Sequence, residues 1–269
     1  MDNRPIGVFD SGVGGLTVVN ALMQSIPNEI IYYVGDTARV PYGNKSKERV
    51  QQYSEEIIEW LIQKDCKMII IACNTASSLA IDYLSNKFTL PIIGVIDPGV
   101  NCAIATTKNQ SIGIIGTHAT IQSDSYGKRL KSLNSELQII NQACPLFVPL
   151  VEEGLIEGQI PTLIAKSYLN HFTNTDVDTI ILGCTHYPIL EKTIRNILGD
   201  GISLVDSGKV TAEVVSDSLK ENRLLSDRVK GEVHSFVTDS KKSFEKVVTR
   251  SLYPVFDIGI SSTTRIDIN

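Results

Sequence analysis

The sequence predicts an α/β fold with two pseudo-symmetric lobes, mainly parallel sheets and an active site in the cleft between the lobes. Short apolar runs alternate along the chain with amphipathic segments of helical length. These runs are apolar at successive positions, which is typical of strands buried on both faces of a parallel sheet. A run that ends in a small residue and a cysteine occurs twice, within 69–77 and within 180–188.

Landmarks in the two halves of the chain repeat at nearly the same spacing. One such match would be unremarkable, because short apolar strands are common in α/β proteins. Three matches at nearly the same sequence offset indicate an old duplication whose halves face each other. The matched residues are Cys73 with Cys184, Asp10 with Thr117, and Asp97 with Asp206.

The first half of the chain reads as four strands, each followed by a helix. Pro27 ends the first helix, and Ser46 is expected to cap a long helix whose apolar stripe has helical spacing. The predicted strands are 6–9, 30–34, the run before Cys73, and 90–95, and the predicted helices are 17–26, the one after Ser46, 75–87 and 97–107.

The second half repeats this alternation and then returns to the first lobe. We expect strands at 111–115, 137–140 and 178–183, a helix that ends near 132, an irregular segment at 145–154, and helices at 160–172 and from 208 to about 222. The remainder reads as a strand at 233–237, a helix at 240–250 and a strand at 255–260, which we expect to pack on the first lobe.

Composition excludes several classes of function. The chain has 269 residues, 42% of them hydrophobic and 20% charged, with a net charge of −5. Without a long Lys/Arg cluster, this charge argues against a nucleic-acid surface. The sequence contains no apolar run of membrane-spanning length and no signal peptide at its start, so we expect a cytoplasmic protein that does not bind membranes.

The five cysteines do not form a disulfide or metal pattern. Their odd number in an apparently cytosolic chain argues against a disulfide framework. The sequence has no Cys-x-x-Cys and no His-x-x-x-His, so we expect no metal site. Cys66, Cys102 and Cys144 are interpreted as small buried hydrophobic residues.

Cys73 and Cys184 are different, because each follows a predicted parallel strand and precedes a predicted helix. Ligands bind at this edge of open α/β sheets, and a helix N-terminus lowers the pKa of a thiol. Asp10 is predicted at the same edge as Cys73, and His186 lies two residues after Cys184.

Several of these signals also have simpler interpretations. Gly12, Gly14 and Gly15 follow the first strand and form either an anion cradle or a tight turn that merely requires glycine. Thr117 and Thr120 stand before a predicted helix, and a role as its N-cap explains either of them as well as a place in the site does. Taken alone, Glu152 and Glu153 read as solvated surface residues, and His186 as a hydrogen-bonding residue at a helix start.

Two thiols on facing lobes suit the inversion of a stereocentre that bears a hydrogen. One group removes the proton from one face of the carbon, and the other supplies a proton to the opposite face. A thiolate and a thiol can perform these two steps when their pKa values are moved toward neutrality. The sequence has no motif for pyridoxal phosphate or a metal, so we expect a reaction without a cofactor.

Five sequence blocks together resemble the glutamate racemases. They are Gly7-Val8-Phe9-Asp10-Ser11-Gly12-Val13-Gly14-Gly15, Arg39-Val40-Pro41-Tyr42-Gly43, Ala72-Cys73-Asn74-Thr75-Ala76, Val148-Pro149-Leu150-Val151-Glu152 and Leu182-Gly183-Cys184-Thr185-His186. The resemblance extends over essentially the whole chain. It implies cofactor-independent interconversion of L- and D-glutamate, which supplies D-glutamate for peptidoglycan synthesis in the cell wall.

The resemblance also implies roles for individual residues. Cys73, assisted by Asp10, exchanges the proton on one face, and Cys184, assisted by His186 and Glu152, exchanges it on the other. The implied substrate-binding residues are Asp10, Ser11, Pro41, Tyr42, Gly43, Asn74, Thr75, Thr117, Thr120, Thr185 and His186. It further implies a homodimer and two lobes, one formed by residues 1–97 and 208–269 and the other by 98–207.

Two other functions compete with this one. An aspartate or related amino-acid racemase would keep both cysteines but have a different pocket. A two-lobed solute-binding protein would explain the cleft and the duplication without any need for the thiols.

Overall fold

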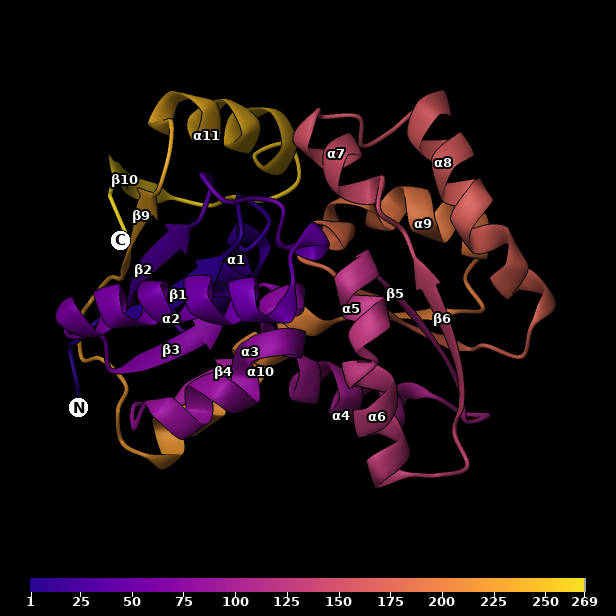
Figure 1. Cartoon of the computed structure of the whole chain (residues 1–269), viewed down its shortest axis with the longest axis horizontal. Coiled ribbons are helices and arrows are strands. Elements are labelled where there is room, and N and C mark those ends of the chain that lie inside the picture. The colour runs from indigo at the N-terminus through magenta and orange to yellow at the C-terminus, as the bar shows by residue number, and fades with distance from the viewer. Residues whose placement is uncertain (269) are drawn as a thin grey trace.

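A computed structural model describes residues 1–268 and contains two parallel sheets (Figure 1). The first sheet combines strands from the beginning of the chain with two strands from its end, because β9 pairs with β2 and β10 pairs with β9. In spatial order its strands are β10 (Ile260–Arg265), β9 (Glu232–Val237), β2 (Ile30–Gly35), β1 (Ile6–Asp10), β3 (Met68–Ile71) and β4 (Ile92–Gly94).

The second sheet repeats the order of the first. Its strands are β6 (Gln138–Ala143), β5 (Ser111–Gly116), β7 (Thr179–Gly183) and β8 (Ser203–Asp206). The sequence β6-β5-β7-β8 matches β2-β1-β3-β4, and all of these pairings are parallel. The predicted α/β fold with two pseudo-symmetric lobes is therefore confirmed.

Helices cover both faces of the first sheet. Successive side chains of a strand point to opposite faces, so neighbouring residues of one strand pack against different helices. Phe9 and Ile71 pack with apolar residues of α2 (Lys47–Gln63) and α3 (Asn74–Lys87) on one face. Val8 and Ile70 belong to the cluster that contains apolar residues of α1 (Leu16–Ser25), α10 (Ser207–Glu221) and α11 (Lys241–Val247). Ser46 caps α2 as predicted, accepting a hydrogen bond from the Arg49 N–H.

The second sheet is also enclosed by helices. On one face, Ile114 and Ile181 pack with α4 (Ile96–Thr106) and α6 (Ser125–Leu133). On the other, Ile180 and Leu182 pack with the remaining large helices of this half. These are α7 (Phe147–Glu152), α8 (Gln159–Leu169) and α9 (Glu191–Leu198).

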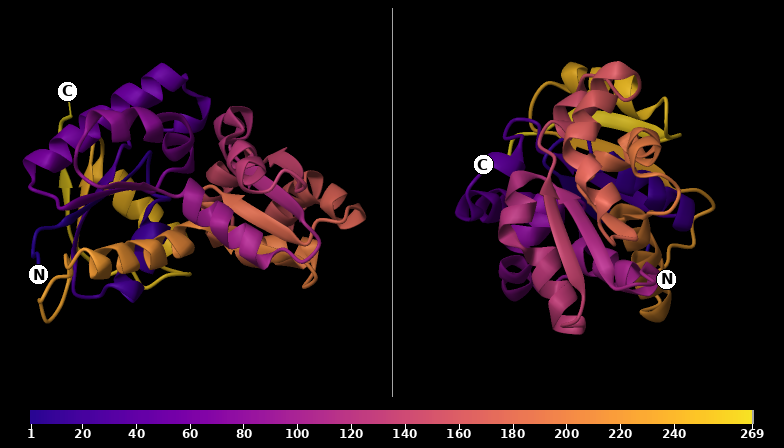
Figure 2. Two further views of the ribbon diagram at one scale, coloured as in Figure 1. Left: turned by 90° about the horizontal axis from the view of Figure 1, so that it is seen from below. Right: turned by 90° about the vertical axis from the view of Figure 1, so that its right-hand side faces the viewer.

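Shorter helical segments complete the fold. They are helix α5 (His118–Ser123), the 3₁₀ turns Tyr42–Asn44, Asn170–Asn174 and Tyr187–Leu190, and a π-helical turn, Val248–Leu252. The left view of Figure 2 separates the two lobes, and both chain ends lie on the lobe that contains the first sheet. The lobe boundaries at residues 97 and 207 remain a prediction.

Four predictions about elements are wrong in detail. The segment at 145–154, expected to be irregular, contains α7. The helix expected to end near residue 132 is broken at Asp124, whose φ of 53° lies in the left-handed region. The final strand is Ile260–Arg265 rather than 255–260, because Pro254 lacks a backbone donor and the chain turns there. A 3₁₀ turn follows Cys184, and α9 begins only at Glu191.

Among residues 1–268, none of the helices combines the length and the apolar character needed to cross a membrane.

Candidate active site

Cys73 and Cys184 line the same cavity, which has a volume of about 290 Å³ and is built from both halves of the chain. Cys73 follows β3 and Cys184 follows β7, so the carboxyl ends of the two sheets face each other across the cavity. Both thiols are nearly inaccessible to solvent, with exposures of 5% and 6%. The two cysteines, one from each half of the chain, therefore share a single cavity.

Almost all of the predicted site residues line this cavity. They are Asp10, Ser11, Pro41, Tyr42, Gly43, Cys73, Asn74, Thr75, Thr117, Glu152, Cys184, Thr185 and His186. Thr120 is buried behind the wall, where its hydroxyl lies 3.3 Å from that of Thr75 and 3.1 Å from that of Thr117. The structure thus brings the predicted residues together at one place.

Cys73 lies in an environment that favours its protonated form. The residue caps α3, and its sulfur accepts a hydrogen bond from the Ala76 N–H at 3.5 Å. Burial raises the pKa of the Cys73 thiol to about 12, and the negative charge of Asp10 adds to this effect. The helix N-terminus does lower this pKa through the Ala76 N–H, as predicted, but the loss of hydration outweighs it, so the net shift is upward.

Asp10 is itself buried between the two halves. One carboxylate oxygen accepts a hydrogen bond from the Gly12 N–H at 2.9 Å, and the other accepts one from the Thr185 hydroxyl at 3.2 Å. Burial raises the pKa of Asp10 despite these contacts. The carboxyl group therefore has an increased affinity for a proton, as a proton-handling partner of Cys73 requires.

Cys184 has a histidine beside it, and this histidine contacts a glutamate. His186 Nδ1 lies 3.8 Å from the Cys184 sulfur, and His186 Nε2 lies 3.3 Å from Glu152 Oε1. Burial lowers the pKa of His186, but the hydrogen bonds with Cys184 and Glu152 outweigh it and raise this pKa to about 10. His186 is thus poised as an imidazolium next to the thiol, and Glu152 contacts the site rather than only solvent.

The glycine turn after β1 is a point of close approach between the halves. A Cβ atom on Gly14 would overlap with Thr185 Oγ1 and His186 Nδ1. The Thr17 hydroxyl, one turn further along, donates a hydrogen bond to the Thr185 carbonyl at 3.1 Å. Of the two interpretations of this turn, the structure therefore supports a steric requirement for glycine.

Hydroxyl groups from both halves meet at one wall of the cavity. Thr75 Oγ1 lies 3.0 Å from Thr117 Oγ1. Thr117 also caps α5, accepting a hydrogen bond from the Thr120 N–H. The interpretation of Thr117 as an N-cap is confirmed, and it is compatible with a place in the cavity wall.

The Asn74 amide links the two halves beneath the cavity. It donates to the Tyr126 hydroxyl at 2.8 Å and to Ser207 Oγ at 3.2 Å. The Ser207 hydroxyl in turn donates to the Leu182 carbonyl at 3.1 Å. The residue next to Cys73 is therefore connected to the strand that leads to Cys184.

The loop that contains Pro41 and Tyr42 is held from behind by a buried carboxylate. The Tyr42 hydroxyl donates to Asp36, which is fully buried and also accepts from Arg39 Nε at 2.7 Å. The Thr238 hydroxyl, in the segment after β9, donates to the same carboxylate at 2.8 Å. This network fixes the aromatic ring of Tyr42 in the cavity wall.

Sequence reasoning missed several residues of the cavity. Val148 and Pro149 stand in the same block as Glu152, and His118 directly follows Thr117, so these positions carried a signal. The missed lining residues are Val40, Asn44, His118, Pro145, Val148 and Pro149. In the part of the chain that the structure describes, no group of three or more His, Cys, Asp or Glu side chains forms a candidate metal site.

Comparison with known proteins agrees with this site. The family model for Asp/Glu/hydantoin racemases matches residues 15–215. A glutamate racemase of Geobacter metallireducens is 44% identical over 93% of both chains. The crystal structure of a Bacillus anthracis glutamate racemase superposes with a TM-score of 0.92 at 39% identity, covering 97% of this chain and 98% of that one.

A glutamate racemase of Francisella tularensis in complex with D-glutamate gives the same TM-score of 0.92 at 38% identity, covering 100% of this chain and 99% of that one. An aspartate racemase of Picrophilus torridus, at 20% identity and a TM-score of 0.59, shares the fold alone. With two lobes, two facing cysteines and these similarities over nearly its full length, the chain belongs to the Asp/Glu/hydantoin racemase family.

Proposed function

We propose that the protein is a glutamate racemase, an isomerase that interconverts L- and D-glutamate without a cofactor. The observation that carries the proposal is the single cavity lined by Cys73 from one half and Cys184 from the other. A cavity of about 290 Å³ lies at the small end of the range for ligand sites, as suits a single amino acid.

Each thiol serves one face of the substrate carbon. In one direction, the Cys184 thiolate accepts the Cα proton and becomes a thiol, while the Cys73 thiol donates its proton to the opposite face and becomes a thiolate. The reverse reaction exchanges these roles. Asp10 assists Cys73, because its charge acts on that thiol. His186 assists Cys184, because its Nδ1 lies beside the sulfur, and Glu152 assists through its contact with His186 Nε2.

The carbanion formed at Cα is the costly species of this reaction. Hydrogen-bond donors fixed in a pocket with little water stabilise such charge better than solvent does. The donors proposed for the substrate carboxylates and the acceptors proposed for its ammonium belong to residues of the cavity wall. They are Asp10, Ser11, Pro41, Tyr42, Gly43, Asn74, Thr75, Thr117, Thr185 and His186, with Thr120 acting through Thr75 and Thr117.

The two competing functions have less support. The aspartate racemase of Picrophilus torridus is only 20% identical to this chain, whereas the glutamate racemase of Geobacter metallireducens is 44% identical. A solute-binding protein would have no need for two buried thiols in its pocket.

The cellular setting follows from this function. D-Glutamate made by the protein supplies peptidoglycan synthesis and hence the cell wall. We propose a cytoplasmic homodimer as the working form, with glutamate as its small-molecule partner.

Incubation of the purified protein with L-glutamate in D₂O tests the function. Loss of the α-proton signal in NMR, together with loss of optical rotation, is the expected result. Replacing either Cys73 or Cys184 with Ala lowers kcat by at least about 10²-fold, since each variant lacks one acid/base group. The control is Cys102→Ala in α4, which keeps full activity. Full activity in either of the first two variants removes that thiol from the mechanism, and preference for aspartate overturns the substrate.

A further inference from the structure

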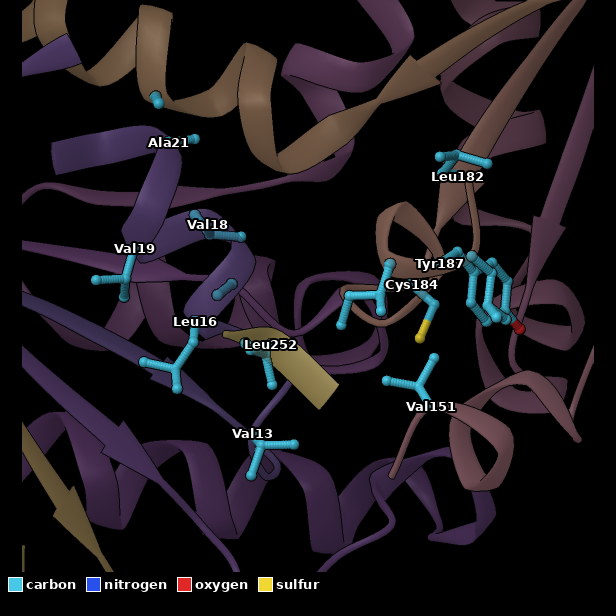
Figure 3. Close-up of a cluster of buried hydrophobic side chains, with 14 of the residues drawn as sticks. Val13, Leu16, Val18, Val19, Ala21, Val151, Leu182, Cys184, Tyr187 and Leu252 are labelled. Atoms are coloured by element: carbon cyan, nitrogen blue, oxygen red, sulfur yellow. The ribbon is translucent and has the colours of Figure 1, made fainter. Parts of the chain in front are cut away.

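The C-terminal helical segment reaches from the first lobe to α7, the helix that ends at Glu152 (Figure 1). Its base is fixed to the first sheet, because Phe244 of α11 packs beside Tyr33 of β2 with ring centroids 6.4 Å apart. Its end, the π-helical turn Val248–Leu252, lies against the second half. Leu252, Val151 and Cys184 belong to one buried cluster, in which the Cys184 sulfur points toward Val151 (Figure 3).

Two side chains of this turn bind the last carbonyl groups of α7. Arg250 donates to the Glu152 carbonyl and also pairs with the Glu153 carboxylate at 3.0 Å. The Ser251 hydroxyl donates to the Val151 carbonyl. The last carbonyls of a helix lack partners in its regular hydrogen-bond ladder, and a cation there is favourable. The Val151 carbonyl already accepts from the Gly154 N–H at 2.8 Å, and Arg250 and Ser251 add a cap from a distant part of the chain.

The chain after α7 is shaped to receive Arg250. Gly154 has a φ of 71°, in the left-handed region, and a Cβ atom there would lie 2.6 Å from Arg250 Cγ. Glycine thus permits both the turn and the close approach of the arginine stem. The contact is a built feature of the fold rather than a chance surface pair.

This contact continues directly into the Cys184 side of the site. Glu152 is the last residue of α7, its side chain meets His186 Nε2, and His186 Nδ1 meets the Cys184 sulfur. Cys73 is held differently, by the Ala76 N–H within its own half. A shift at the end of α7 would therefore move the partners of Cys184 directly, and it would reach Cys73 only indirectly, through His186 and Asp10.

We propose that Arg250 and Ser251 are positioning residues that orient Glu152 and His186 and thereby tune proton exchange at Cys184 more strongly than at Cys73. The inference rests on the proposed racemase function. It predicts a kinetic asymmetry, because each enantiomer loses its proton to a different cysteine. Slower proton exchange at Cys184 makes C–H cleavage more rate-limiting for the enantiomer that Cys184 deprotonates. For the other enantiomer it slows the later protonation step, so C–H cleavage becomes less rate-limiting.

The test compares primary α-deuterium isotope effects on kcat/KM for both enantiomers. For Arg250→Ala we expect kcat/KM to fall by about 10- to 100-fold, since misplacement of a catalytic group by about 1 Å can cost 10²-fold. The isotope effect should rise for one enantiomer and fall for the other. His186→Gln should shift both effects in the same directions, and Asp10→Asn should shift them in the opposite directions.

Three further variants separate positioning from general damage to the fold. Lys246→Ala, at an exposed residue of the same helix, should leave both isotope effects unchanged. Arg250→Lys should restore part of the lost rate because it keeps a cation. Ser251→Ala should reproduce the asymmetry more weakly, and it serves as the test if Arg250→Ala does not fold. Isotope effects that stay constant, or that move together, overturn the inference, whereas a wild-type protein without racemase activity overturns the proposed function instead.

Discussion

At the scale of single residues, the two thiols lie in different electrostatic surroundings. Burial and the neighbouring Asp10 carboxylate raise the pKa of Cys73 to about 12. Cys184 instead has His186 beside it, whose pKa is raised to about 10. The two cysteines therefore face different charges, a carboxylate near Cys73 and a histidine with a raised pKa next to Cys184.

The raised pKa of His186 has a consequence for stability. The pKa of His186 in the folded protein, about 10, exceeds its ordinary value of 6.5, so protonation of this residue stabilises the fold. This stabilisation is fully present below about pH 6.5 and is lost as the pH rises toward 10. Urea unfolding of wild type should therefore show a steeper loss of free energy over this interval than unfolding of His186→Gln. A His171→Gln control, at an exposed histidine, should behave as wild type, and equal slopes for all three proteins would refute the argument.

At the scale of elements, the turns at the carboxyl ends of β1 and β7 pack against each other and complete the site. Gly14 in the first turn contacts Thr185 and His186 in the second without room for a side chain. The Thr17 hydroxyl at the start of α1 adds a hydrogen bond to the Thr185 carbonyl. The position of His186 thus depends on the absence of a Cβ atom on a strand-to-helix turn in the other half.

We expect Gly14→Ala to separate these turns. Overpacking of this kind typically costs about 1–3 kcal/mol, so the melting temperature should fall, and racemisation should fall with it because His186 shifts. Gly201→Ala is the matched control, since a Cβ atom there meets no other atom within 4 Å. Unchanged activity in Gly14→Ala would show that the turn can yield without moving His186.

The elements themselves were predicted well where apolar periodicity is strong. The strands that lead to Cys73 and Cys184 and the long helix after Ser46 are present as expected. The helix break at Asp124 was missed, because the left-handed conformation there depends on local packing beside Gly127. The last strand was placed too early, because β10 takes its register from β9, a contact that apolar spacing does not encode.

At the scale of the whole molecule, a buried ion pair ties four segments together at the end of the first sheet opposite to the site. Lys67 Nζ donates to Glu29 Oε2 at 2.6 Å, to the Asp2 carbonyl at 2.6 Å and to the Leu224 carbonyl at 2.7 Å. The first residues, the turn before β2, the start of β3 and the connection after α10 therefore share one cation. Lys67 precedes β3, whereas Cys73 follows it, so this ion pair and the active site lie at opposite ends of the strand.

Loss of this cation should destabilise the fold without altering the site. Lys67→Met leaves the Glu29 carboxylate buried and unpaired, which typically costs about 3–5 kcal/mol. Lys220→Met removes one partner of the exposed pair with Asp217 and should cost at most about 1 kcal/mol. Denaturant midpoints measure both, and kcat at low temperature should remain normal in each. A reduced kcat in folded Lys67→Met would show that the buried ion pair also acts on the active site.

Local patterns of a few residues were enough to predict the α/β fold, the repeated halves and the two cysteines at strand ends, because they encode the burial of a strand and the residue that follows it. The net rise in the pKa of Cys73 and the support of Tyr42 by Asp36 became visible only in the folded chain. Folding also brought Arg250 to the end of α7, far away along the chain. Desolvation and contacts of this kind depend on which distant residues pack together, and local patterns do not specify that packing.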